Sequence, residues 1–311
     1  MLRHMLLAAS DSDRARQLIS SAPLARGVVA RYVAGESAAD AVAVSRDLID
    51  AGLLVTVDYL GEDTTDPDQA AAVTAEYCGL LRQLAAAGLS RGGRAEVSVK
   101  PTAVGLQLPE HGRKTATENI ARICAAARDA GTTVTVDAEE HTTAEATQAI
   151  VAGLRQDFPD LGCVIQSSLR RAAGDCAALA RPGSRVRLCK GAYDSPAAAA
   201  FATRHEVDRS YARCLRALMS GPGYPMVATH DPRLTRIAAA QAVLERRAPE
   251  SFEYQMLYGI RPAEQRRLAA TGAQVRVYLP YGRDWYGYLV RRLAERPANL
   301  TFFLRSLASS R

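Results

Sequence analysis

The feature that most constrains the fold is a pattern that recurs eight times along the chain. Each unit has a short run of β-branched and apolar residues, a polar or glycine-bearing turn, and an amphipathic segment rich in alanine and arginine. We predict strands in the eight runs, which span residues 54–59, 95–99, 132–136, 162–165, 185–188, 224–228, 252–257 and 273–279. Eight strands that alternate with helices favour parallel pairing through right-handed crossovers, and this number of units in 311 residues indicates a closed (β/α)8 barrel.

An open, doubly wound α/β sheet is the main alternative fold. A nucleotide-binding sheet of that type normally has a Gly-x-Gly-x-x-Gly turn after its first strand, whereas the first run here leads into Leu60, Gly61 and Glu62. No long linker rich in proline, glycine or serine divides the units. The sequence therefore predicts one barrel domain over residues 51–311, preceded by a helical arm over residues 1–50.

Helices are expected both in the arm and between the strands. Apolar residues at helical spacing predict helices at 10–19 and 24–50. Between the strands, amphipathic segments predict helices at 117–130, 143–157 and 195–219.

Composition excludes several classes of protein. No stretch approaches the roughly 18 to 20 apolar residues of a membrane span, and the apolar run near the start is too short for a secretion signal. The six cysteines show no paired spacing, which is typical of free thiols in a reducing compartment. The net charge of +6 is spread along helices, and aromatic residues make up only 6%. We therefore expect a cytoplasmic protein without a nucleic-acid partner, whose contact with a membrane, if any, is peripheral.

Polar residues follow most of the predicted strands. In a (β/α)8 barrel the carboxyl ends of the strands converge on one mouth, where catalytic residues lie. The residues expected at this mouth are Glu62, Lys100, Asp137, Gln166, Arg187, Lys190, Tyr193, His230, Leu257 and Tyr278. Two of the three lysines of the chain are in this set, the third being Lys114. Such a set suits an organic anion.

The segment after the eighth strand adds four residues to the candidates. Tyr288, Arg291, Arg292 and Glu295 are spaced three, four and seven residues apart, so they share one face of a predicted helix. Two guanidinium groups on one face could hold a carboxylate. Read alone, the same pattern is more typical of a solvated helix surface.

The residue types raise three alternatives to consider for the site. Asp137, Glu139, Glu140 and His141 could suggest a metal site, but side chains adjacent in sequence diverge in direction, and we predict no metal. Lys100 or Lys190 could form a Schiff base, as in barrel aldolases. The third alternative is a barrel that binds an anion without catalysis.

Six multi-residue motifs occur in a characteristic order. They are Ser98-Val99-Lys100, Val136-Asp137-Ala138-Glu139-Glu140, the stretch from Arg187 to Tyr193, Ala228-Thr229-His230-Asp231, the stretch from Phe252 to Leu257, and the stretch from Val275 through Leu293. In these motifs the chain resembles the flavin-dependent proline dehydrogenase family, in its monofunctional form. The resemblance implies a distorted (β/α)8 barrel that holds FAD, with the last helix over the strand ends.

The resemblance also implies a reaction. L-Proline would lose a hydride from C5 to flavin N5 and become Δ1-pyrroline-5-carboxylate, in the first step of proline catabolism to glutamate. Electrons would then pass to a quinone. A positive group near the flavin and close placement of the reacting atoms are what such a transfer needs.

By the same resemblance, each candidate residue takes a role. The residues expected to bind the cofactor are Asp137, Ala138, Gln166, Arg187, Lys190, Gly191, Ala192, Thr229 and His230. Those expected around the substrate are Lys100, Tyr193, Leu257, Tyr278, Tyr288, Arg291 and Arg292. Asp137 and Arg187 are the predicted catalytic residues, and we expect Asp137 to pair with Lys100 in the mouth. Glu62 would gate entry by pairing with Arg291, and Glu295 would orient the two arginines.

Overall fold

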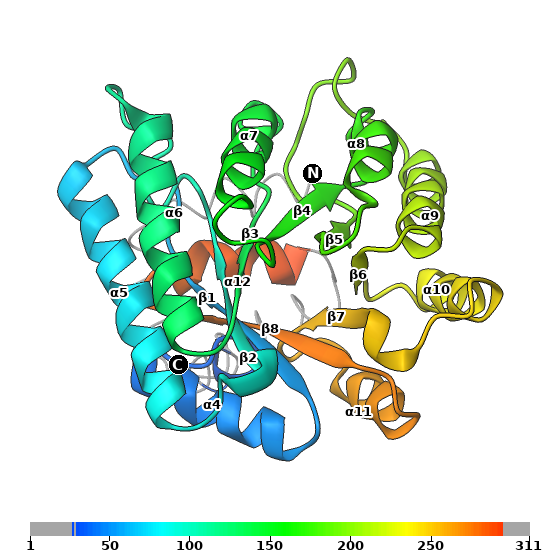
Figure 1. Cartoon of the computed structure of the whole chain (residues 1–311), viewed down its shortest axis with the longest axis horizontal. Coiled ribbons are helices and arrows are strands. Elements are labelled where there is room, and N and C mark those ends of the chain that lie inside the picture. Colours follow the sequence, from blue (N-terminus) through cyan, green and yellow to red (C-terminus); the bar gives the residue numbers. More distant parts are fainter. Residues whose placement is uncertain (1–26, 28, 295–311) are drawn as a thin grey trace, which may run out of the picture.

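The computed structural model describes residue 27 and residues 29–294, with side chains described as far as Leu289. Eight parallel strands form a closed barrel in chain order (Figure 1). They are β1 (Leu54–Tyr59), β2 (Ala95–Val99), β3 (Val134–Val136), β4 (Gly162–Gln166), β5 (Arg185–Cys189), β6 (Tyr224–Ala228), β7 (Glu253–Leu257) and β8 (Val275–Tyr281). All eight predicted strands are present, with ends that differ from the predicted ones by no more than two residues.

Pairing of the last strand with the first closes the barrel. β8 runs parallel to β1 over six residue pairs, from Leu54 with Arg276 to Tyr59 with Tyr281. An open sheet would have two edge strands that pair on one side only, whereas every strand here pairs on both sides, so the alternative fold is wrong. Closure brings all eight strand ends to one rim.

Nine named helices accompany the strands in the described part of the chain. They are α4 (Ala38–Asp50), α5 (Pro67–Ala86), α6 (Gly112–Asp129), α7 (Ala144–Leu154), α8 (Ala172–Leu179), α9 (Arg204–Ser220), α10 (Pro232–Leu244), α11 (Pro262–Ala270) and α12 (Trp285–Ala294). Two short 3-10 helices are η1 (Arg91–Gly93) and η2 (Pro249–Ser251). Figure 1 shows α5 to α11 around the strands, whereas α12, in orange-red, crosses between them in this view. Among the residues described, no helix is long and apolar enough to cross a membrane.

The predicted helix at 24–50 is interrupted. Residues 31–37 form a turn and an extended segment, and α4 starts only after Ser37, whose hydroxyl accepts a hydrogen bond from the Asp40 amide in a capping box. The extended segment docks on β8, because the Ala34 amide donates to the Pro280 carbonyl. The prediction over residues 31–37 was therefore wrong. The helix predicted at 10–19 lies outside the described residues, and the domain division at residue 50 stays a prediction.

The helix predicted from residue 195 also begins later. α9 starts at Arg204, where Thr203 and Glu206 form a second capping box. Residues 195–203 form a loop that contains Pro196. A local cap therefore determines where this helix begins, and the apolar period alone placed it nine residues too early.

The two faces of the barrel strands differ in character. Residues that point outward are apolar and pack against helices; Val55, Val57, Val97 and Val99 are fully buried there. Residues that point inward alternate with them and are mostly polar. The inward polar residues of the described strands and their ends include Thr56, Asp58, Glu96, Ser98, Lys100, Thr135, Asp137, Gln166, Arg187, Glu253, Gln255 and Arg276. The lumen thus holds a charged network where such barrels commonly hold Val, Ile and Leu.

Candidate active site

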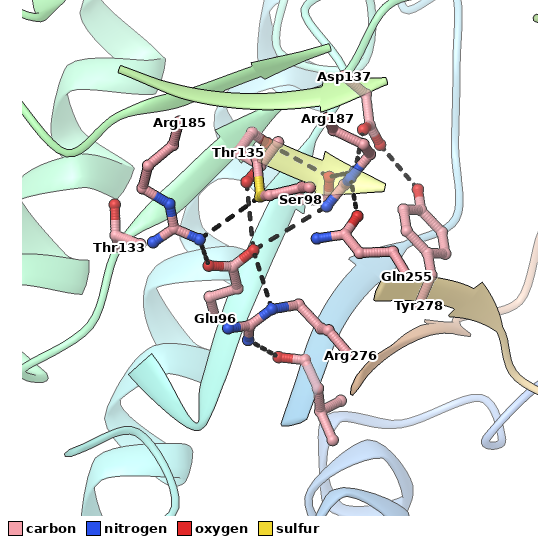
Figure 2. A network of polar contacts seen from close by, with 12 residues as sticks. Glu96, Ser98, Thr133, Thr135, Asp137, Arg185, Arg187, Gln255, Arg276 and Tyr278 are labelled. Atoms are coloured by element: carbon pink, nitrogen blue, oxygen red, sulfur yellow. Dashed lines mark hydrogen bonds and ion pairs between the residues drawn. The ribbon is translucent and has the colours of Figure 1, made fainter. Parts of the chain in front are cut away.

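Arg187 lies at the centre of the polar network near the barrel mouth. From β5 its Nη1 donates to Asp137 Oδ1 at 2.6 Å and to Ser98 Oγ at 2.8 Å, while Nε donates to Gln255 Oε1 at 2.5 Å (Figure 2). The guanidinium lies over the Tyr278 ring, 5.3 Å from its centroid. Nη2 is buried and has no hydrogen-bond partner within the described chain. Arg187 is therefore fixed by three hydrogen bonds, and its Nη2 faces Glu96 at 4.0 Å without a hydrogen bond.

Asp137 joins Arg187 to Tyr278. Its Oδ2 accepts a hydrogen bond from the Tyr278 hydroxyl at 2.7 Å. Burial, together with the negative charge of Asp137, raises the pKa of Tyr278 well above its ordinary value. Tyr278 therefore stays a neutral hydrogen-bond donor at physiological pH.

Lys100 pairs with Asp58 rather than with Asp137, which corrects the predicted pair. Lys100 Nζ lies 2.6 and 2.7 Å from the two Asp58 carboxylate oxygens, and both residues are buried. Asp58 points into the lumen from β1, next to β2, whereas Asp137 is engaged by Arg187 and Tyr278. Burial alone would lower the pKa of Lys100, but Asp58, aided by Glu62 and Asp137, outweighs burial and raises it.

These contacts argue against a Schiff-base lysine. A nucleophilic amine must be neutral, yet Lys100 is held charged in a buried pair. Lys190 lies 2.6 Å from Asp208 and 3.1 Å from Asp231, which are also bonded to Arg233. Neither lysine lies in the apolar surroundings that a Schiff-base amine requires.

A second charged layer lies below Arg187, toward the amino ends of the strands. Glu96 is completely buried, lies 2.6 Å from Arg185 and 3.8 Å from Arg276, and approaches Arg187 Nη2 at 4.0 Å (Figure 2). Arg276 pairs with Glu253, whose Oε1 also accepts from Gln255 Nε2 at 2.5 Å. The lumen network holds the carboxylates Asp58, Glu96, Asp137 and Glu253 and the cations Lys100, Arg185, Arg187 and Arg276. Four charges of each sign cancel formally, which limits the cost of burying them.

The other predicted mouth residues on the strand ends have defined contacts. Gln166 Nε2 donates to the Glu139 carbonyl at 2.6 Å. His230 Nε2 accepts from the Leu257 amide at 2.9 Å, and the Tyr193 hydroxyl lies 3.4 Å from Glu62 Oε2. Closure of the barrel thus brings these predicted residues to the same end of the strands.

Gly191 follows β5 in a conformation that a side chain would strain. Its φ is +102°, and a Cβ there would collide with Ser168 Oγ and Gln166 Oε1. The close approach leaves the Gly191 backbone exposed beside Gln166, as a cofactor cradle requires.

The last helix is described only in part. Tyr288 is buried on α12, and the backbone of Arg291 and Arg292 continues this helix. Their side chains and all of Glu295 lie outside the described residues. The arginine clamp and the pairing of Glu62 with Arg291 therefore stay predictions.

Sequence reasoning missed the residues that hold the predicted ones in place. Asp58, Glu96, Ser98 and Gln255 lie inside strands, whereas the predicted site residues lie mainly at strand ends. The sequence could have indicated them, because each is a polar residue two positions from another inward-pointing residue and therefore lies on the same face of its strand. No group of three or more His, Cys, Asp or Glu side chains suited to a metal occurs in the described part of the chain.

A closed (β/α)8 barrel with charged side chains at the carboxyl ends of its strands has the architecture of an enzyme of the TIM-barrel class. The family model described as "Proline dehydrogenase" matches residues 41–305. Proline dehydrogenase 1 of Bacillus subtilis subsp. natto is 37% identical over 308 residues, which cover 99% of each chain. The proline dehydrogenase of Deinococcus radiodurans is 36% identical over 279 residues, 89% of each chain.

The chain therefore belongs to the proline dehydrogenase family, whose members are enzymes of proline catabolism and are in general flavin-dependent. Its full-length relatives are the monofunctional forms. The solved structure of proline utilization A from Bdellovibrio bacteriovorus inactivated by N-propargylglycine matches with a TM-score of 0.82 at 24% identity, over 92% of this chain and 34% of that one. At this identity the match shows the shared barrel fold.

Proposed function

We propose that the chain uses FAD to oxidise L-proline to Δ1-pyrroline-5-carboxylate and passes the electrons to a quinone. The observation that carries the proposal is the buried Arg187 guanidinium, which Asp137, Ser98 and Gln255 hold in place near the barrel mouth. A positive group fixed in this way suits the electron-rich ring of a reduced flavin. Membership of a flavin-dependent family supports the same choice.

Four groups of residues at the mouth suit a flavin dinucleotide. Arg187 and Gln166 would face the ring, and Gly191 and Ala192 would let the backbone approach it. Lys190, Thr229 and His230 would line the rest of the cofactor, with Asp137 and Ala138 at its substrate side. When bound, FAD would supply the hydride acceptor.

The chain's own residues would then bind and orient proline. Tyr278 and Leu257 offer a phenol and an apolar wall to a pyrrolidine ring, and Lys100 stays charged beside them through Asp58. Tyr193 and Tyr288 would complete the enclosure, while Arg291 and Arg292 would bind the carboxylate through paired hydrogen bonds. Asp137 would hold Arg187 and Tyr278 at fixed separation, so its role is to orient the reacting groups.

Flavin spectroscopy tests the proposal directly. Purified protein should be yellow, and L-proline added without oxygen should bleach the flavin band. Pyrrolidine, which has the ring but no carboxylate, is the matched control and should bleach it far more slowly. Protein that stays colourless after incubation with FAD, or yellow protein that proline does not bleach, would contradict the proposal.

The electron acceptor has its own test. We propose that a quinone reoxidises the bleached protein, at peripheral contact with the membrane's cytoplasmic face. A water-soluble quinone should restore the flavin band faster than dissolved oxygen. Equal rates with both acceptors would exclude a dedicated quinone step.

A further inference from the structure

Glu139 is a buried carboxylate that contacts neither Arg187 nor Lys100 by a hydrogen bond. It lies on the loop after β3, and its Oε2 accepts from the Thr102 amide at 3.0 Å while Oε1 accepts from the Thr102 hydroxyl. Only 4% of Glu139 and 1% of Thr102 are exposed. Burial raises the pKa of Glu139 to about 7, although the Thr102 hydrogen bonds and Lys100 favour the charged form and Glu62 opposes it. Burial of a carboxyl group costs free energy, so we expect a structural role of Glu139 that offsets this cost.

Thr102 carries the contact to the loop after β1. Its Oγ1 accepts from the Asp63 amide at 3.0 Å, and its carbonyl accepts from the Thr64 amide at 3.2 Å. Asp63 has a φ of 56°, a left-handed conformation that the surroundings must support. Because a hydroxyl has a single proton, donation to Glu139 turns the Thr102 oxygen lone pairs toward Asp63.

The same loop carries Glu62 at the barrel mouth. Glu62 precedes the two anchored amides directly and lies within 3.4 Å of the Tyr193 hydroxyl. On the opposite side, the Glu139 backbone carbonyl holds Gln166 at the end of β4. Glu139 therefore connects the loops after β1 and β2 with the strand end where we expect the cofactor.

We propose that Glu139 is a positioning residue that holds the loop bearing Glu62 in place through Thr102, and thereby governs proline binding without touching proline. The link to proline rests on the proposed function. The positioning of the loop by Glu139 and Thr102 is independent of the proposed function, because it concerns contacts within the chain. Glu140, the next residue, has an exposed side chain and serves as the matched control.

Hydrogen exchange tests the hold on the loop. In Glu139→Gln the amide group would present a donor to Thr102, so one of the two contacts is lost; Thr102→Val removes the hydroxyl itself. Exchange at the Asp63 amide should become roughly tenfold faster in both variants. It should stay at the wild-type rate in Glu140→Gln, and Thr102→Ser should restore it. Unchanged exchange in both Glu139→Gln and Thr102→Val would overturn the proposal.

Steady-state kinetics tests the link to the substrate. We expect the proline KM to rise roughly tenfold in Glu139→Gln and Thr102→Val, with kcat and flavin content unchanged. The double variant should be no worse than either single variant, because both act through one contact. Faster exchange with an unchanged KM would overturn the role in substrate binding. Wild-type protein that does not oxidise proline would instead contradict the proposed function. Hydrogen exchange at the Asp63 amide would still decide whether Glu139 positions the loop.

Discussion

Two arginines inside the barrel are almost equally buried but differently partnered. Arg276, on β8 in the lower layer, donates through all three nitrogens: Nε and Nη2 bind Glu253, and Nη1 binds the carbonyls of Val55 and Gly93. Arg187, nearer the mouth, lacks a hydrogen-bond partner at Nη2 within the described residues. The exposed fractions are 3% and 4%. Burial therefore does not distinguish these two arginines; the number of satisfied donors does.

The carboxyl groups of the two layers differ in the same way. Burial opposes the charge of Glu253, but Arg276 and Arg185 outweigh it and lower its pKa, so this group stays ionised. Glu139, beside the mouth, has no such cation within hydrogen-bonding distance, and its pKa rises to about 7. Glu253 in the lower layer thus stays ionised near neutral pH, whereas Glu139 beside the mouth titrates there.

The largest expected effect concerns the lower layer. Arg276→Ala should lower the free energy of unfolding by about 3–5 kcal/mol, because it leaves Glu253 buried without its cation. Urea unfolding followed by circular dichroism measures the change. Arg266→Ala, at an exposed position on α11, is the control and should change it by less than about 0.5 kcal/mol. A loss in Arg276→Ala as small as in the control would show that the lower layer does not stabilise the fold.

Arg187→Lys should affect chemistry more than folding. Lysine keeps the positive charge for Asp137 but lacks the planar fork that reaches Ser98 and Gln255 at the same time. We expect proline-dependent bleaching of the flavin to slow by about 100-fold to 1,000-fold. Stopped-flow absorbance measures the rate, and urea unfolding should show a smaller loss than Arg276→Ala. If the variant unfolded as readily as Arg276→Ala, the distinction between the two arginines would fail.

The fold was predictable because its signal is repetitive. Eight β-branched runs determine strand number and order, and the predicted ends of β1, β2 and β6 agree with the structure to the residue. Helix starts were less predictable, since caps at Ser37 and Thr203 override the apolar period.

The candidate site was predictable only in part. Residues after strand ends, such as Lys100 and Asp137, follow from the barrel architecture. Which of them pair does not, because partner choice depends on strand register and on inward residues such as Asp58. Glu139 was visible in a motif, but its contact with Thr102 joins two loops whose approach no local pattern encodes.

The third prediction concerns pH. The pKa of Glu139 is about 7 in the folded chain and ordinarily 4.5, so the folded state holds this proton more tightly than the unfolded chain. Its contribution to stability is complete below about pH 4.5 and is lost as the pH rises through 7. Between about pH 5 and 8, wild-type protein should therefore lose about 2–3 kcal/mol relative to Glu139→Gln.

Urea unfolding of both proteins at the two pH values measures this difference. Glu253→Gln should show no such trend over the same range, since the pKa of Glu253 lies below its ordinary value. A pH-independent difference between wild-type protein and Glu139→Gln would show that the mouth end does not titrate differently from the lower layer.

The smallest expected effect concerns the hydroxyl group of Tyr278. Tyr278→Phe keeps the ring under the Arg187 guanidinium and removes the hydroxyl that donates to Asp137 Oδ2 at 2.7 Å. Asp137 retains Arg187 as a partner, so proline-dependent bleaching should slow by about tenfold, the equivalent of about 1.4 kcal/mol. Phe252→Leu, at a buried aromatic residue that contacts Tyr254 rather than the lumen network, controls for packing and should leave the rate within about twofold. If bleaching slows while the free energy of unfolding stays the same, this hydroxyl orients groups at the mouth. It then does not act like the lower layer, which we expect to stabilise the barrel. Equal losses of rate and stability would place Tyr278 with Arg276 instead.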